Sequence, residues 1–348
     1  MLIFVFLIQK SYAQIENTEL TDNASEQAVN NVPSNVPSST PTKIVVQPTF
    51  DQLSARSWFE RLSNTLKNIN FEIAYVVSRP NRDIMPYVWR HAILENGDSA
   101  EQLSLLNGPG YEQIRLNNKV SIFEPSFNPY SIRAENIEGP IPSAFIHDPN
   151  ILYAAYDVLL MGRNRILGRM SQQIRIVSKD NTRFGYHLWL DEQTGLILKL
   201  NMYDENKLIK QIQVTQLSLS ADVKAYFANI QAEQLPPTVF AKSPQEIALP
   251  WDVGFIPVGM KKVRQKEHLL RQTGQPVQYV MLSDGVVDVS VYVLSATEAL
   301  QDDLSMSADG TSVVSMSDGN VQVTVVGEIP TKTANKIANS IVVVNSND

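Results

Sequence analysis

The sequence predicts a mainly β protein of the α+β class, in which a long antiparallel meander precedes a smaller C-terminal domain of sheet and helix. From Phe71 to about Leu217, apolar and polar residues alternate with a period of two between turn-forming breaks. Strands and helices do not alternate, which excludes a doubly wound nucleotide-binding fold. The tripeptide Ser-Asp-Gly occurs at 283–285 and again at 317–319, each time before a strand-like run that a tight turn would start.

The first residues are typical of an export signal. Leu2 to Ile8 is an uninterrupted apolar run, and Ser11-Tyr12-Ala13 places small residues at the two positions that a signal peptidase reads. We therefore expect a signal peptide over 1–13 and an exported mature chain. No Lys or Arg precedes the run, which a start codon upstream of Met1 would explain; the alternative is an ordinary buried strand. No segment approaches the roughly 20 apolar residues of a transmembrane helix.

A disordered linker is predicted over 14–48, where Asn, Ser and Pro dominate and too few apolar residues occur to form a core. The large domain is expected over 49–231. It opens with a helix capped by Thr49 or Asp51, whose apolar side chains share one helical face: Ala55, Trp58, Phe59, Leu62, Leu66 and Ile69.

The meander of the large domain is predicted to contain strands at 71–77, 87–93, 111–117, 119–124, 166–170, 172–178, 184–190, 196–203 and 208–217. One helix is expected to interrupt the series near 150–160, and a short helix over 222–230 closes it. Strands joined mostly by hairpins are typical of an antiparallel meander.

Two neighbouring strands carry an apolar wall. Alternation places Phe184, Tyr186, Leu188 and Leu190 on one face, and Leu196, Leu198, Leu200 and Met202 on one face of the next strand. The turn at 191–195 would pair them. Two interpretations stay open: a conventional barrel core, or a concave hydrophobic groove lined by Phe184, Tyr186, Leu188, Leu196, Leu198 and Leu200.

The second domain is expected over 249–346, after a Pro-containing linker at 232–248. Its predicted strands are 261–270, 277–283, 286–294 and 321–327. Gly285 and Gly319 are expected to supply a positive φ in the two Ser-Asp-Gly turns. A helix from Pro330 would bury Ala334, Ile337, Ala338 and Ile341.

Residues able to support chemistry are scattered. The chain has no cysteine, and its four histidines, at 91, 147, 187 and 268, show no local zinc-binding spacing. Phosphate-binding glycine loops and the Gly-x-Ser-x-Gly elbow of hydrolases do not occur. With 36 acidic and 29 basic side chains, a net charge of −7, the chain is not a typical nucleic-acid binder. No enzyme, metal or cofactor is predicted.

Basic side chains form two clusters: Arg163, Arg165, Arg169 and Arg175, and then Lys261, Lys262, Arg264, Lys266 and Arg271. In an acidic protein such clusters could meet an acidic peptide or anionic lipid headgroups; the alternative is a solvated strand edge that discourages aggregation. Alternation along the second stretch places Lys262, Arg264 and Lys266 together, with Lys261 and Arg271 opposite. This trio is our candidate for partner binding.

Several segments resemble a known family. The stretches WDVGFIPVGM (251–260) and VGEIPTKTANKIANS (326–340), with the Ser-Asp-Gly strand between them, resemble the C-terminal domain of the RseB/MucB family of periplasmic sigma-factor regulators. WLDEQTGLILKL (189–200) is similar to a hairpin of LolA/LolB lipoprotein-binding domains, and the large domain of the RseB family has the same half-open antiparallel β-barrel with helices. The resemblance covers about residues 50–346.

The resemblance implies a non-enzymatic negative regulator of the envelope stress response. Such a protein binds the periplasmic domain of an RseA-like anti-sigma factor with both domains and protects it from site-1 proteolysis. Lipopolysaccharide or the acyl chains of mislocalised lipoprotein then release it. The alternative is a periplasmic lipoprotein carrier of the LolA/LolB type, against which the second domain argues. A hydrolase would need an activity that no motif predicts, and the sequence leaves homo-oligomerisation open.

Overall fold

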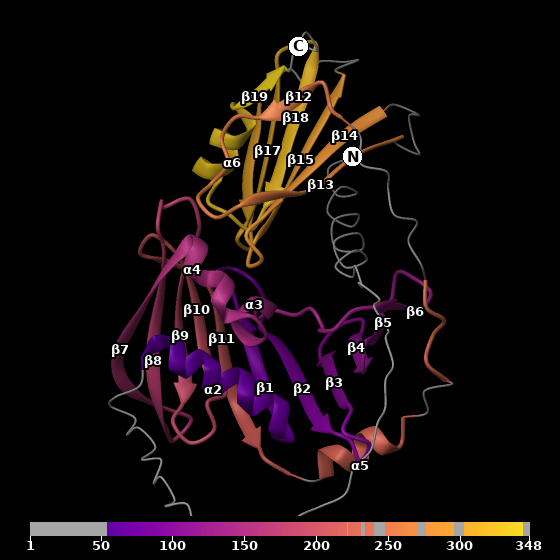
Figure 1. Ribbon diagram of the computed structural model, residues 1–348, viewed down its shortest axis with the longest axis vertical. Helices are drawn as coiled ribbons and strands as arrows, with labels where there is room; N and C mark the ends of the chain where they lie inside the picture. The colour runs from indigo at the N-terminus through magenta and orange to yellow at the C-terminus, as the bar shows by residue number, and fades with distance from the viewer. Residues whose placement is uncertain are drawn as a thin grey trace, which may run out of the picture.

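The computed structural model describes residues 54–220, 222–230, 234–239, 248–269, 276–295 and 303–343. We name the part from 54 to 230 the large domain and the part from 249 to 343 the small domain. They stack along the long axis of the molecule, the small domain above one end of the large sheet (Figure 1). The signal and linker predicted at 1–48, and Arg271, lie outside the described residues.

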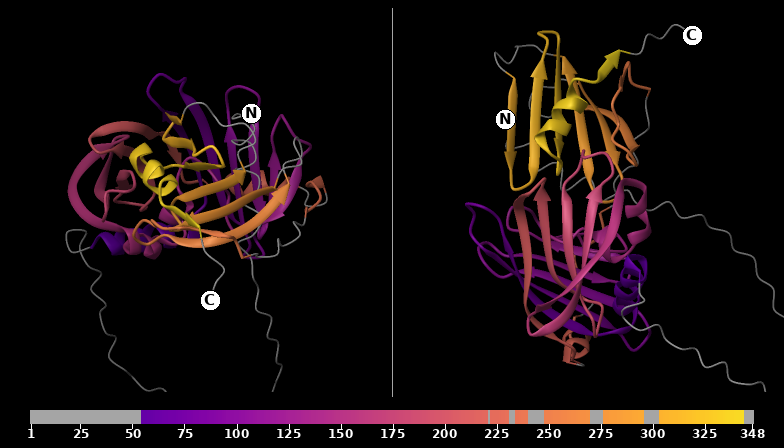
Figure 2. Two further views of the ribbon diagram at one scale, coloured as in Figure 1. Left: turned by 90° about the horizontal axis from the view of Figure 1, so that it is seen from above. Right: turned by 90° about the vertical axis from the view of Figure 1, so that its left-hand side faces the viewer.

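An eleven-stranded antiparallel sheet forms the large domain, with the order β6-β5-β4-β3-β2-β1-β11-β10-β9-β8-β7. Its strands are β1 (Phe71–Ser78), β2 (Met85–Ile93), β3 (Ser99–Leu105), β4 (Tyr111–Leu116), β5 (Lys119–Phe123), β6 (Tyr130–Arg133), β7 (Tyr156–Ile166), β8 (Arg169–Ser178), β9 (Gly185–Asp191), β10 (Ile197–Asp204) and β11 (Lys207–Ser218). Because β6 and β7 remain edges, the sheet curves without closing (Figure 2). The predicted mainly β, half-open architecture is confirmed.

Short helices cover the inner face of this sheet. α2 (Ala55–Asn68) buries Trp58, Phe59 and Leu62 against it, as its apolar spacing predicts. Its N-cap is Ser54, whose hydroxyl accepts from the Ser57 N–H, and not Thr49 or Asp51, which lie outside the described residues. α3 (Ser143–Ile146), the 3₁₀ turn Pro149–Ile151 and α4 (Leu152–Ala155) continue the cover, whereas α5 (Asp222–Ala228) packs against β2.

One stretch differs from its prediction. The helix expected over 150–160 ends at Ala155, and β7 begins at Tyr156 because this stretch pairs with β8, with Val158 opposite Ile176. The strand expected at 166–170 is the tip of that hairpin. A short apolar run is compatible with either helix or strand, and here the available pairing partner decides.

The small domain is a six-stranded antiparallel sheet with the order β13-β14-β15-β18-β17-β16. Its strands are β13 (Lys261–Leu269), β14 (Pro276–Ser283), β15 (Asp288–Ser295), β16 (Leu304–Ala308), β17 (Thr311–Ser317) and β18 (Val321–Gly327). α6 (Thr331–Ala338) buries Ala334, Ile337 and Ala338 on one face, as predicted. Ile341 instead belongs to β19 (Ile341–Val343), which pairs with β12 (Trp251–Val253). Six strands were not predicted from the sequence: β3 and β6 of the large domain, and β12, β16, β17 and β19 of the small domain.

Candidate functional site

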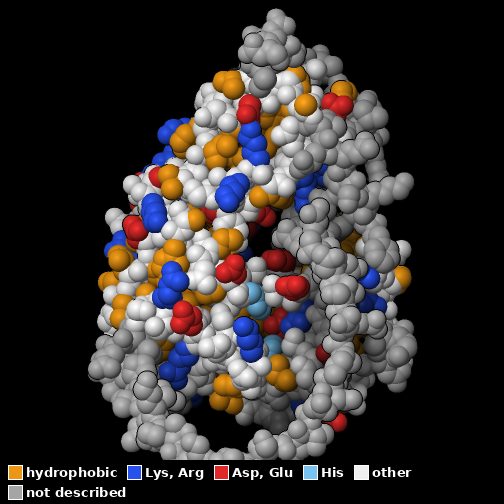
Figure 3. Space-filling model, in the orientation of Figure 1, with side chains coloured by type: hydrophobic (Ala, Val, Ile, Leu, Met, Phe, Trp, Pro, Cys, Tyr) orange, Lys and Arg blue, Asp and Glu red, His pale blue; other side chains and the backbone are white. Residues whose placement is uncertain are grey.

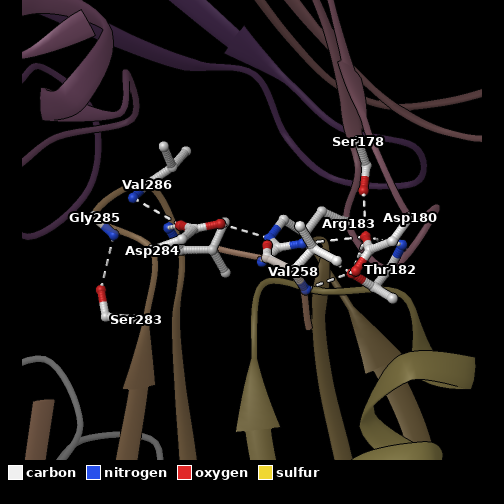
Figure 4. Close-up of polar contacts among 10 residues, drawn as sticks. Ser178, Asp180, Thr182, Arg183, Val258, Ser283, Asp284, Gly285 and Val286 are labelled. Carbon is white, nitrogen blue, oxygen red and sulfur yellow. Dashed lines mark hydrogen bonds and ion pairs between the residues drawn. The ribbon is translucent and has the colours of Figure 1, made fainter. Parts of the chain in front are cut away.

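One arginine joins the two domains. Arg183, in the loop between β8 and β9, has a side chain that is 0% exposed. Its guanidinium forms an ion pair with Asp284 of the small domain, with Nε and Oδ2 2.5 Å apart, and Nη2 donates to the Val258 carbonyl at 2.6 Å (Figure 4). A buried charge is tolerated only when it is paired and hydrogen-bonded, so this contact fixes how the domains meet.

Asp180 completes the contact from the large-domain side. Its Oδ2 accepts from the Val258 N–H at 2.8 Å, and its Oδ1 accepts from Ser178 and Thr182 (Figure 4). Burial alone would raise the pKa of Asp180, but these hydrogen bonds outweigh it and hold the pKa below its usual value. The backbone of Val258 therefore donates to Asp180 and accepts from Arg183.

Two glycines allow the close approach. A Cβ on Gly285, whose φ is +80°, would lie 2.1 Å from Cδ1 of Ile151. A Cβ on Gly259, whose φ is +83°, would lie 3.0 Å from the Cβ of Ala155. Both glycines belong to the small domain and meet the segment around α4, so their lack of a side chain is what lets the domains touch.

Further ion pairs extend the junction outwards. Lys210 of β11 pairs with Glu328, Lys332 of α6 with Glu205 at 2.7 Å, and Arg82 with Asp309 at 3.1 Å. Lys332, Glu205, Arg82 and Asp309 are largely exposed, so the latter two pairs contribute little stability. They show that the loops between β1 and β2 and between β10 and β11 both face the small domain.

A recess opens beside the junction, and Figure 3 shows it as a hollow between the domains with acidic side chains around it. Glu138 and Asp288, one from each domain, lie close enough for their carboxylates to repel each other. Both side chains reach solvent, yet partial desolvation raises the pKa of Glu138 to about 7, and repulsion from Asp288 adds to the shift. Gln113 of β4 holds the backbone of Glu138 with two hydrogen bonds, donating to its carbonyl and accepting from its N–H. A cationic group of a partner would relieve this repulsion.

Tyrosines line the inner face of the large sheet towards the small domain. This tyrosine row consists of four residues on four strands: Tyr75 of β1, Tyr87 of β2, Tyr111 of β4 and Tyr130 of β6. All four lie towards the end of the sheet at which the β1–β2 loop, with Arg82, is found. The rings of Tyr75 and Tyr87 stack at 5.4 Å, and Gln113 donates to the Tyr111 hydroxyl at 2.7 Å. Tyr87, Tyr111 and Tyr130 are half-buried. Amphipathic rings in this state suit a protein interface.

The six predicted groove residues all lie in the interior. Phe184, Tyr186, Leu188, Leu196, Leu198 and Leu200 are at most 3% exposed. Tyr186 contacts Phe145 of α3 edge to face at 5.0 Å, so the helices close this wall. One residue departs from the expected face. A bulge at Leu198 makes Ile197 the partner of Leu190, and Ile197 joins the core cluster that Leu198 does not.

The predicted basic trio is split by another bulge. β13 pairs Lys262 with Leu282 but Arg264 with Met281, so Val263 is the extra residue. Paired residues point to the same face, which places Lys261, Arg264 and Lys266 together and Lys262 opposite, where it pairs with Asp252. The expectation that Lys262 shares a face with Arg264 and Lys266 is therefore wrong. Simple alternation fails wherever a bulge intervenes.

Several residues of this site carry no signal that the sequence analysis could use. Arg183 lies in an ordinary turn sequence, and Asp284 has the same local sequence as Asp318. The tyrosine row could have been found, because Tyr75 and Tyr87 fall on the alternating face at similar distances from one hairpin. Within the described residues, no three His, Asp or Glu side chains gather as metal ligands, and no helix is long and apolar enough to span a membrane.

Each of the two domains matches a known family model. The family model of the MucB/RseB N-terminal domain matches residues 54–239, and that of the C-terminal domain matches 245–342. The sigma-E factor regulatory protein RseB of Salmonella typhimurium is 29% identical over 284 residues, covering 81% of this chain and 88% of that protein. The sigma factor AlgU regulatory protein MucB of Pseudomonas aeruginosa is 27% identical over 305 residues, covering 86% of this chain and 94% of that protein.

Two solved structures of MucB show the same similarity. MucB in complex with MucA(peri) is similar with a TM-score of 0.66 and 26% identity, over 84% of this chain and all of that chain. Another crystal structure of MucB gives a TM-score of 0.50 at 25% identity, over 82% of this chain and 97% of that chain. The family models together span most of the sequence and both sheets. The chain belongs to the MucB/RseB family.

Proposed function

We propose that this protein is a non-enzymatic periplasmic regulator that binds the periplasmic part of a MucA- or RseA-like anti-sigma factor and protects it from site-1 proteolysis. The observation that carries the proposal is the match of both domains, in one arrangement, to the MucB of a MucA complex. The TM-score to that MucB is 0.66, against 0.50 to another crystal structure of MucB. The relatives are named as regulatory proteins.

The junction supports a grip by both domains. Arg183, Asp180 and the two glycines hold the domains in register, so surfaces on each can act on one extended partner. The acidic pair of Glu138 and Asp288, one from each domain, offers negative charge to a basic segment, and the half-buried tyrosines offer apolar area with polar tips. On the small domain, the face that carries Lys261, Arg264 and Lys266 offers complementary charge to an acidic segment.

Binding to the purified periplasmic fragment of the cognate anti-sigma factor tests this proposal. We expect Asp288→Lys to weaken binding at least tenfold by titration calorimetry, because it reverses one charge of the acidic pair. It should also speed cleavage of the fragment by the site-1 protease. Glu95→Lys, at a 90% exposed position on the far side of the large domain, is the matched control. If the unmodified protein neither binds nor protects the fragment, the function is different.

The small-domain surface has its own test, sharpened by the bulge in β13. Reversing Arg264 and Lys266 together should slow association, most strongly at low ionic strength, since rim charges act chiefly on the association rate. Reversing Lys262, which the bulge turns to the other face, serves as the control. Equal effects of the two variants would remove the basis for assigning this face to the partner.

The release step belongs to the same proposal. Acyl chains of lipopolysaccharide or of mislocalised lipoprotein would enter between the inner face of the large sheet and its helices, where the wall around Leu188 and Leu200 is closed by α3. Entry requires these helices to move. A cysteine pair linking α2 to the 191–195 turn, where Thr65 donates to the Thr194 carbonyl, should block dye binding and lipid-induced release but leave partner binding intact. Dye binding that persists in the cross-linked protein would place the lipid elsewhere.

A further inference from the structure

The hairpin of β7 and β8 leaves large apolar side chains in water. Single exposed apolar residues are common on protein surfaces, but here several gather within twelve positions of one hairpin. Those that are at least 40% exposed are Leu159, Leu160, Met161, Leu167 and Met170. Figure 3 shows hydrophobic and basic side chains mixed along the flank where Figure 1 places β7.

The fold treats the two edges of the large sheet differently. The β6 edge is covered by the segment after the large domain: the Ser131 N–H donates to the Pro237 carbonyl at 3.0 Å, and the Val239 N–H donates to the Ser131 carbonyl at 2.8 Å. β7, at the other edge, pairs on its outer side with no strand of the described residues. It is also the longer edge, with eleven residues against four. A long, apolar, uncovered edge is a surface awaiting a partner.

The hairpin tip holds an apolar residue in an unfavourable conformation. Leu167 has a φ of +52°, in the left-handed region that a leucine rarely adopts. The other described non-glycine residues with positive φ are all polar: Asn81, Asn117, Asn181, Glu205 and Asp309. Asn is the ordinary choice for such a turn. A strained leucine that is also 40% exposed serves neither the turn nor the core.

Positive charge accompanies these apolar side chains. Between 157 and 175 the chain has four arginines and one carboxylate, Asp157, in a protein whose net charge is −7. Arg163 pairs with Glu192 and Arg169 with Asp191, whereas Arg165 and Arg175 are exposed and form no ion pair with a described residue. Arginine at an edge also discourages strand pairing, but that role does not require exposed leucines.

The arrangement of side chains favours a lipid surface over a flat protein partner. Leu160 pairs with Ile174 and points to the inner face of the sheet, while Leu159 pairs with Arg175 and points to the outer face. A flat partner would cover only one of these faces. A layer of headgroups and acyl chains can surround an edge strand from both sides and accept hydrogen bonds from its free N–H groups through phosphates.

We propose that the β7–β8 hairpin docks this protein on an anionic phospholipid bilayer. The β7 edge lies along the surface, with Leu159, Leu160, Met161 and Leu167 at the boundary between headgroups and acyl chains. Arg165 and Arg175 bind lipid phosphates. Docking uses neither the domain junction nor the recess, so it does not depend on the partner-binding proposal.

Flotation of the purified protein, without residues 1–13, on vesicles tests this inference. Vesicles of phosphatidylglycerol and phosphatidylethanolamine should bind the protein. Phosphatidylcholine vesicles should bind it with an affinity at least about tenfold lower. Leu160→Ser combined with Leu167→Asn should reduce binding roughly tenfold. Asn suits the left-handed turn, so this loss cannot come from unfolding of the tip. Arg165→Gln and Arg175→Gln should each cost roughly fivefold at low salt.

Met306→Ser, at a 43% exposed position on β16, is the control and should bind like the unmodified protein. Equal binding to both vesicle types, or unchanged binding of the Leu160/Leu167 variant, would overturn the inference. Displacement by inorganic phosphate alone would mean a phosphate site and not a membrane surface. Loss of anti-sigma fragment binding in the same variant, without any vesicle binding, would assign the hairpin to a protein partner and also overturn it.

Discussion

The two Ser-Asp-Gly turns have the same sequence and the same local geometry. Gly285 has a φ of +80° and Gly319 a φ of +90°. Asp284 accepts from two backbone N–H groups at 2.9 Å, and Asp318 accepts from two at 2.8 and 2.9 Å. In both turns the serine hydroxyl accepts from the glycine N–H. Local sequence is sufficient to form this turn twice.

Their surroundings differ completely. Asp284 is 4% exposed and pairs with Arg183 of the other domain, whereas Asp318 is exposed. A Cβ on Gly285 would collide with Ile151, but a Cβ on Gly319 would meet nothing within 4 Å. The same tripeptide is thus a domain connector in one place and a solvent-exposed turn in the other. Comparing matched substitutions in the two copies isolates what the junction contributes.

The largest difference is expected for the aspartates. Asp284→Asn keeps an oxygen for the turn but removes one of the two carboxylates that pair with the buried Arg183, leaving Asp180 at 3.2 Å. This loss should lower the free energy of unfolding by about 2–4 kcal/mol. Asp318→Asn should leave it nearly unchanged. Urea unfolding followed by tryptophan fluorescence measures both, and small-angle scattering shows whether the domains separate. Similar effects of the two variants would mean that the Arg183 contact does not couple the domains.

The glycines should show a smaller difference. Gly319→Ala places an alanine in a left-handed conformation, at a cost of about 1 kcal/mol. Gly285→Ala carries the same strain and also forces Ile151 to move. The displacement of Ile151 should cost about 1–3 kcal/mol more. Ile151→Ala in the Gly285→Ala background should recover part of this extra loss, as a double-mutant cycle would show. No recovery would mean that Ile151 is not the obstacle.

The smallest difference between the two regions is expected when the pH is lowered and the aspartates are protonated. The pKa of Asp180 is lowered in the folded protein because hydrogen bonds to its carboxylate outweigh burial, so its contribution is complete above about pH 4 and is lost as pH falls further. The pKa of Asp318 is also lowered, by the N–H groups of Val321 and Asn320. Protonation of Asp180 should expose the Val258 amide to hydrogen exchange, while protonation of Asp318 should affect only its own turn. Asp180→Asn should remove the pH dependence at Val258.

Much of the fold follows from local pattern. Period-two alternation located most strands of both sheets, because the side chains of a strand half-buried on one face must alternate. The stripes of α2 and α6 were equally clear, since one face of each helix packs on a sheet. Short segments were missed or misplaced. β7 was taken in part for a helix, because short apolar runs fit either structure. β3, β6, β12, β16, β17 and β19 were not predicted.

Faces and contacts required the tertiary structure. Single-residue bulges at Leu198 and Val263 reversed side chains that simple alternation had assigned, and no local residue type marks either bulge. The predicted groove residues are indeed apolar and share a wall with one exception, but only packing shows that α3 closes over them. The tyrosine row lay in the alternating pattern, yet only the fold brings its four strands to one end.

The sequence by itself determined the two sheets, the two Ser-Asp-Gly turns and the absence of any cysteine chemistry, because each depends on residue type and near neighbours. The tertiary structure decided which turn enters the domain junction, where Arg183 finds Asp284, and which sheet edge is left open to water. These depend on residues about 100 positions apart meeting in space, and two identical tripeptides contain no information about which of them will be buried.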